Sequence, residues 1–184
     1  MNDTSSKPEI LTTESSVVYR NRWMLVREDK IVRASGATGI YGVVEKPDFA
    51  VIAAYQDGEL HLVEQYRYPV GARYWEFPQG SSHQPGINAA DLAAAELREE
   101  TGLVASSIEH VGRLFPSYGF VTQAFDVYLA TGLSDIGTRL DPEEEGLIAK
   151  PFSVSTVERM IIGGEIRDAA TVATFGLLRL KGVL

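Results

Sequence analysis

One short acidic stretch limits what this chain can fold into more than any other part of its sequence. Residues 89–102 read AADLAAAELREETG and have the length of a helix ended by Gly102, because glycine commonly follows the last helical turn. Glu96, Glu99 and Glu100 share one face of that helix, since residues three and four apart are neighbours. Such like charges destabilise a helix, and anions near its C-terminus oppose its dipole. A bound Mg²⁺ or Mn²⁺ would offset both effects, because these ions prefer oxygen ligands.

An ordinary solvent-exposed helix face is the alternative interpretation of these carboxylates. The preceding segment favours a site. Residues 75–80, WEFPQG, read as an apolar strand end that breaks into a loop rich in Gly, Ser and Pro before the helix. A strand, a glycine loop and an acidic helix in this order are typical of a site that binds a metal and a phosphate.

At this point the chain resembles a known family. Residues 96–103, ELREETGL, resemble the second half of the Nudix box, whose pattern is G-x5-E-x7-R-E-U-x-E-E-x-G-U with U aliphatic, and Gly80 resembles its opening glycine. Two positions differ, since the arginine of the motif is Ala95 and its first glutamate falls on Ile87. In addition, the loop after Gly80 is one residue too long for the pattern. In the family these two groups are chiefly a structural pair, so losing both leaves no unpaired buried charge. We expect a differently braced loop around a working site.

The resemblance implies the metal ligands. Glu96, Glu99 and Glu100, with the backbone carbonyl of Gln79, would hold one to three Mg²⁺ ions, with Mn²⁺ as a possible replacement. Glu100 would thereby also be a catalytic residue.

A second resemblance lies at the end of a predicted strand. Residues 65–69, QYRYP, are similar to a run found in the ADP-ribose and ADP-sugar pyrophosphatase branch of the Nudix superfamily. Arg67 would bind phosphate there, because a guanidinium makes bidentate contacts to anionic oxygens. Glu76 and Tyr118 would be further substrate-binding residues. An exposed edge-strand arginine and a core tyrosine are the alternatives.

The acidic turn at residues 141–146, DPEEEG, offers a general base, since the helix carboxylates would be committed to metal. In ADP-ribose-type members a loop glutamate just before a strand removes the proton from the attacking water. Glu145 matches that position best and Glu144 second, whereas a solvated charge run is the alternative. Residues 164–173, GEIRDAATVA, resemble the entry to the last helix of that branch, with a role in packing and in capping by Asp168.

Composition excludes several classes of protein. The 184 residues contain no cysteine and three isolated histidines, so neither disulfides nor a thiolate zinc site is expected. A net charge of −8 argues against a nucleic-acid polymer as partner, because phosphate backbones require a basic surface. The chain shows neither a membrane span nor a secretory signal, so we expect no membrane partner and a cytoplasmic location.

The predicted organisation has three parts. Residues 1–16 form a mobile tail, and residues 17–46 form a β-meander with a turn at residues 28–29. A meander this small needs a partner surface, and the resemblance implies a homodimer, with packing on the same chain as the alternative. Residues 47–184 form the main domain, in which mixed strands between helices predict a Nudix-like α/β/α sandwich.

The predicted function is Mg²⁺-dependent hydrolysis of the diphosphate bond in a nucleoside diphosphate linked to another moiety. ADP-ribose is the first expected substrate, with AMP and ribose 5-phosphate as products. A nucleotide-sensing module that does not hydrolyse its ligand, and a structural dimer with a merely solvated helix, are the alternatives.

Overall fold

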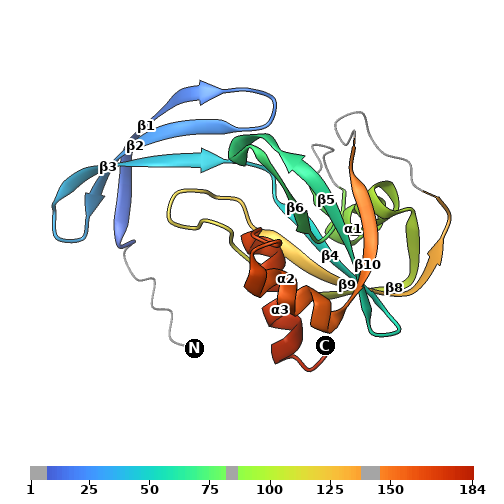
Figure 1. Ribbon diagram of the computed structural model, residues 1–184. Helices are drawn as coiled ribbons and strands as arrows, with labels where there is room; N and C mark the ends of the chain where they lie inside the picture. Colours follow the sequence, from blue (N-terminus) through green and yellow to red (C-terminus); the bar gives the residue numbers. More distant parts are fainter. Residues whose placement is uncertain (1–7, 82–86, 138–145) are drawn as a thin grey trace. The chain divides into compact units, whose positions relative to one another are not determined.

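The computed structural model describes residues 8–81, 87–137 and 146–184 (Figure 1). The chain divides into two compact units. The first lies within residues 1–47 and 117–123, and the second within residues 48–116 and 124–184.

The first unit is an antiparallel sheet of three strands in chain order: β1 (Ile10–Arg20), β2 (Leu25–Arg33) and β3 (Thr38–Glu45). The turn between β1 and β2 is made by Asn21, whose side-chain oxygen accepts hydrogen bonds from the backbone of Trp23 at 2.8 Å and Met24 at 2.9 Å. This is the local bonding that favours Asn in turns.

Two predictions for this unit are wrong in position. β1 begins at Ile10, so the segment expected as a tail up to Ser16 is partly a strand. Residues 28–29 lie inside β2 and do not form a turn. Asp29 is buried in this strand and pairs with Arg27. A charged residue that is typical of a turn therefore lies at a buried position of a strand.

Residues 117–123, the second segment of the first unit, pair with β3. The backbone N–H of Val44 donates to the carbonyl of Phe120 at 2.8 Å, and the N–H of Thr122 donates to the carbonyl of Val44 at 3.0 Å. Residues 117–123 therefore complete β3 from a distant part of the sequence.

The second unit contains a mixed sheet of seven strands in the order β10-β5-β4-β9-β8, with β6 beside β5 and β7 beside β4. β4 and β9 run parallel, and the other neighbours run antiparallel. The strands are β4 (Phe49–Gln56), β5 (Glu59–Arg67), β6 (Ala72–Glu76), β7 (Gln79–Gly80), β8 (Leu103–Leu114), β9 (Phe125–Asp135) and β10 (Ile148–Ser153). A short 3-10 turn, η1 (Tyr68–Val70), links β5 to β6.

Helices cover both faces of this sheet: α1 (Ala89–Thr101) on one face, and α2 (Val154–Gly163) with α3 (Ala169–Leu180) on the other (Figure 1). The reason lies in β4, an uninterrupted apolar run that is buried on both sides. Val51 and Ala53 join the core beneath α2 and α3, whereas Ala50 and Ile52 join the core beneath α1. The predicted α/β/α sandwich is confirmed.

The helix ends follow local sequence signals. α1 starts after Asn88, whose side chain accepts from the backbone of Asp91 at 2.8 Å, and ends at Gly102, which has φ 74°. Asp168 caps α3 as predicted. The cap of α2 is Ser153, because the helix starts directly where β10 ends. In the described part of the chain, no helix is long and apolar enough to cross a membrane.

Candidate active site

A buried carboxylate lies where β5 and β6 pair in the second unit. The side chain of Glu76 is 2% exposed and accepts a hydrogen bond from Gln65 at 2.8 Å. Arg67 holds the same carboxylate with both ends of its guanidinium, through Nε at 3.3 Å and through Nη2. Burial raises the pKa of Glu76, and the charge and hydrogen bonds of Arg67 offset only part of that effect. The structure thus joins two residues that the sequence predicts to bind substrate.

Gln79 connects the acidic helix to the start of α3. Its backbone N–H donates to Oε2 of Glu100 at 3.1 Å, and its side-chain amide donates to Asp168 at 3.3 Å. Glu100 is 2% exposed, so this charged end of α1 is held inside the unit by a backbone donor. The side chain of Gln79 thus bridges two elements, whereas the metal-ligand role of its backbone carbonyl stays a prediction.

Gly80 leaves room for a second carboxylate of α1. A Cβ built on Gly80 would overlap the carboxylate of Glu96, so that carboxylate occupies the space of a missing side chain. The φ angle of Gly80 is not positive, and the glycine is therefore required by this close approach and not by its backbone conformation. The alignment of Gly80 with the opening glycine of the motif has a physical basis.

The third predicted metal ligand, Glu99, is half-buried on the same helix. Within the described ranges no three carboxylate or histidine side chains are already gathered as a metal site. The donor set still fits Mg²⁺, because Glu96 lies against the backbone of Gly80 and the buried Glu100 borders Gln79. Glu96, Glu99, Glu100 and the carbonyl of Gln79 are the groups that would hold such an ion.

A cavity of about 540 Å³ lies beside this region, between the β5–β6 hairpin and the start of α3. Its remaining walls come from η1 and Ala169. Its polar lining is formed by Arg67, Tyr74, Glu76, Arg167 and Asp168. Asp168 accepts from the side chain of Gln79, whose backbone donates to Glu100, so hydrogen bonds connect the cavity wall to the acidic helix. Space of this size admits a nucleoside or a sugar phosphate next to the carboxylates.

Comparisons with known proteins identify the family of this chain. Residues 10–44 match the model of the nucleoside diphosphate sugar hydrolase N-terminal domain. The chain is 32% identical over 174 residues to an ADP-ribose pyrophosphatase of Mycobacterium tuberculosis. The aligned region covers 94% of this chain and 83% of that relative. The chain belongs to the ADP-ribose pyrophosphatase family of Nudix hydrolases.

Two further comparisons extend this result. An ADP-ribose pyrophosphatase of Bacillus subtilis is 27% identical over 136 residues, 73% of each chain. The crystal structure of an ADP compounds hydrolase superposes with a TM-score of 0.85 and 20% identity, covering 97% of this chain and 98% of that one, which shows a shared fold. The predicted family and its hydrolase class are thereby confirmed.

The structure does not test the roles predicted for three residues of this Nudix hydrolase. Glu144 and Glu145 lie outside the described residues, so their role as base stays a prediction. Tyr118 belongs to the first unit, where its side chain is 84% exposed, and its role also stays a prediction. Conversely, sequence reasoning missed Arg167 and gave Asp168 only a capping role, although both lie in the GEIRD run quoted above.

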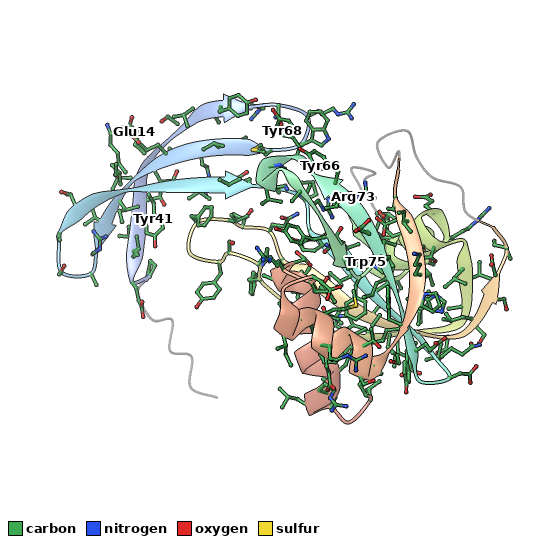
Figure 2. The ribbon with its side chains drawn as sticks, in the orientation of Figure 1. Glu14, Tyr41, Tyr66, Tyr68, Arg73 and Trp75 are labelled. Carbon is green, nitrogen blue, oxygen red and sulfur yellow. The ribbon has the colours of Figure 1, made fainter. Side chains whose placement is uncertain are left out.

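Arg73 on β6, labelled in Figure 2, was also missed, and it contacts Gly146, the last residue of the DPEEEG run. Its Nη2 donates to the carbonyl of Gly146 at 2.6 Å and to that of Glu64 at 3.0 Å, while its Nε pairs with the Glu64 carboxylate at 3.0 Å. Gly146 directly follows Glu145 in the chain. Arg73 therefore fixes one end of the segment that carries the predicted base.

Proposed function

We propose that this chain hydrolyses the diphosphate bond of nucleoside diphosphate sugars, with ADP-ribose as the first substrate and with AMP and ribose 5-phosphate as products. The observation that carries the proposal is the similarity, over nearly the whole chain, to an ADP-ribose pyrophosphatase. The match of residues 10–44 to a nucleoside diphosphate sugar hydrolase domain supports the same substrate class.

The reaction would be Mg²⁺-dependent, with Mn²⁺ as a possible replacement. When bound by Glu96, Glu99, Glu100 and the Gln79 carbonyl, the metal would supply positive charge to the diphosphate and lower the pKa of a bound water. The chain itself positions the substrate in the cavity beside α1 and provides a base. Glu145, or Glu144 as second choice, would accept the proton of the water that attacks phosphorus.

The proposal includes a homodimer formed through the first unit. Its sheet exposes large apolar side chains, among them Val18 at 62% and Ile40 at 66%. Large exposed apolar patches can mark interaction sites, and a second copy of the chain is the partner that the family resemblance implies. A cytoplasmic location stays a prediction.

A nucleotide-binding module without hydrolysis is the second candidate. It is favoured by the first half of the Nudix box, where Ile87 and Ala95 replace the expected glutamate and arginine. The buried Glu100 and the fit of Glu96 against Gly80 favour hydrolysis, because both carboxylates are held in place at the expected face of α1.

The test is chromatography of the products after incubating nucleoside diphosphate compounds with Mg²⁺, using wild type, Glu100→Gln and a control, Glu109→Gln. Glu109 is an exposed glutamate on β8, so its substitution removes one charge far from the cavity lining. We expect wild type and the control to release AMP and ribose 5-phosphate from ADP-ribose, and Glu100→Gln to remain folded but inactive.

Equal activity of Glu100→Gln would refute the role of the helix. Cleavage of a different compound would keep the mechanism and change the substrate. Nucleotide binding without any cleavage by wild type would support the sensing module.

A further inference from the structure

The two arginines of the cavity are in different electrostatic states. The charge of Arg67 is already offset, because both ends of its guanidinium hold the buried carboxylate of Glu76. Using Arg67 to neutralise a phosphate would leave Glu76 as a buried carboxylate with a weakened partner, which is costly. Arg67 therefore shapes the cavity more than it adds positive charge to it.

Arg167 has no such partner. Throughout residues 8–81, 87–137 and 146–184, no carboxylate lies at ion-pair distance from its guanidinium. Its Nε donates to the backbone carbonyl of Gly164 at 2.9 Å, which fixes the side chain without using a negative charge. It is the lining arginine whose charge remains available to an anionic ligand.

The position of Arg167 is built into the turn between α2 and α3. A Cβ on Gly164 would lie 3.2 Å from Nε of Arg167, so the glycine, which has φ 79°, gives the guanidinium its space. On the cavity side the guanidinium carbon lies 5.4 Å from the ring centroid of Tyr74, and Nη1 donates to the tyrosine hydroxyl at 3.4 Å. Two elements thus hold a long, exposed side chain in one place, which lowers the entropy lost when it binds a ligand.

Asp168, the next residue after Arg167, connects the cavity to the acidic helix. Asp168 accepts a hydrogen bond from the Gln79 side chain, and the Gln79 backbone donates to Glu100. A substrate whose diphosphate lies at the carboxylates of α1 and whose other end enters the cavity would bring an anionic group to the cavity that Arg167 lines.

We propose that Arg167, seated on Tyr74 and Gly164, is the phosphate-binding cation of the cavity, a role that sequence reasoning gave to Arg67. The proposal deepens the proposed function, on which it rests, by naming a residue that selects ligands carrying a phosphate. Guanidinium suits this task because it donates two parallel hydrogen bonds to phosphate oxygens.

The test measures binding separately from turnover. Calorimetry without metal follows AMP, ribose 5-phosphate and the uncharged adenosine, on wild type, Arg167→Ala, Arg167→Lys and the control Arg179→Ala. Arg179 is an arginine in the last turn of α3 that pairs with Glu158 at 3.0 Å, so the control removes the same charge from the same unit. Thermal unfolding of each variant verifies that it is folded.

We expect Arg167→Ala to weaken the binding of at least one phosphorylated probe by about tenfold to a hundredfold, the range for a hydrogen bond to a charged group. Adenosine binding should change little, Arg167→Lys should recover part of the loss, and Arg179→Ala should behave as wild type. In turnover of ADP-ribose, KM should rise more than kcat falls.

Three outcomes would overturn the proposal: unchanged binding of both phosphorylated probes to Arg167→Ala, an equal loss for adenosine, or no binding of either phosphorylated probe to wild type. An equal loss for adenosine would make Arg167 a stacking surface for the base. If wild type cleaves no diphosphate compound, the proposed function fails, whereas the calorimetry still decides the role of Arg167.

Discussion

Replacing Gly80 with alanine should separate the activity of this protein from its stability. The new Cβ would overlap the carboxylate of Glu96, which would have to move by about 1 Å to reach ordinary van der Waals contact. The atoms that must move are the end of a flexible side chain, so an altered rotamer costs only about 0.5–1.5 kcal/mol. Alanine also restricts the unfolded chain, which returns about 0.4–1 kcal/mol where φ is compatible.

The free energy of unfolding of Gly80→Ala should therefore stay within about 1 kcal/mol of wild type. Activity should fall far more, because a displacement of about 1 Å at a catalytic group can lower the rate roughly a hundredfold. Urea denaturation measures the first quantity and the rate of AMP release measures the second. Titration with Mn²⁺ adds a third readout, in which the variant should bind the ion more weakly.

Gly176→Ala is the matched control for this experiment. Gly176 lies within α3, its φ is not positive, and a Cβ there would meet nothing within 4 Å. The control should keep full activity and gain up to about 1 kcal/mol of stability, since glycine is a poor helix former. Wild-type activity and metal affinity in Gly80→Ala would refute the reasoning that the place of Glu96 beside this glycine matters.

Two further predictions concern the hairpin of β5 and β6. Because burial raises the pKa of Glu76, the native state binds the proton of this carboxyl group more tightly than the unfolded state does. The stability that the protonated group contributes is complete below the ordinary pKa of glutamate and is lost as the pH rises through the pKa of the folded state. Melting from pH 4 to 8 should show Glu76→Gln gaining on wild type as the pH rises, and a constant difference would contradict this. Arg73→Ala should lower kcat for ADP-ribose by about tenfold with less than about 1 kcal/mol lost in stability, because it frees Gly146 while removing a partly exposed ion pair. Unchanged kcat would show that holding Gly146 does not position the base.

The parts of the fold that the sequence predicted correctly rest on local signals. The helix at residues 89–102 follows from its spacing and its terminal glycine, and the cap at Asp168 follows from the residue type. The continuous apolar run of β4 is likewise a local pattern, typical of a strand buried on both sides.

The errors and omissions have tertiary causes. The Glu28–Asp29 pair reads as a turn, but the burial of Asp29 against Arg27 places it within a strand. Arg67 reads as a free phosphate ligand, and its pairing with Glu76 appears only when β5 and β6 lie side by side. Arg167 lies in the GEIRD run, but its contact with the Tyr74 ring appears only in the fold, since the two residues are 93 positions apart.

The pairing of residues 117–123 with β3 sets an order of events during synthesis. The three strands of the first unit are complete at Pro47, and about 70 further residues must be made before Ser117 is available. At about 5–20 residues per second this takes roughly 4–14 s, whereas hairpins form within microseconds. For those seconds the backbone groups of Val44 that later bind Phe120 and Thr122 are an open strand edge. Slow codons in this stretch would lengthen the time in which two nascent chains on one messenger can pair at that edge.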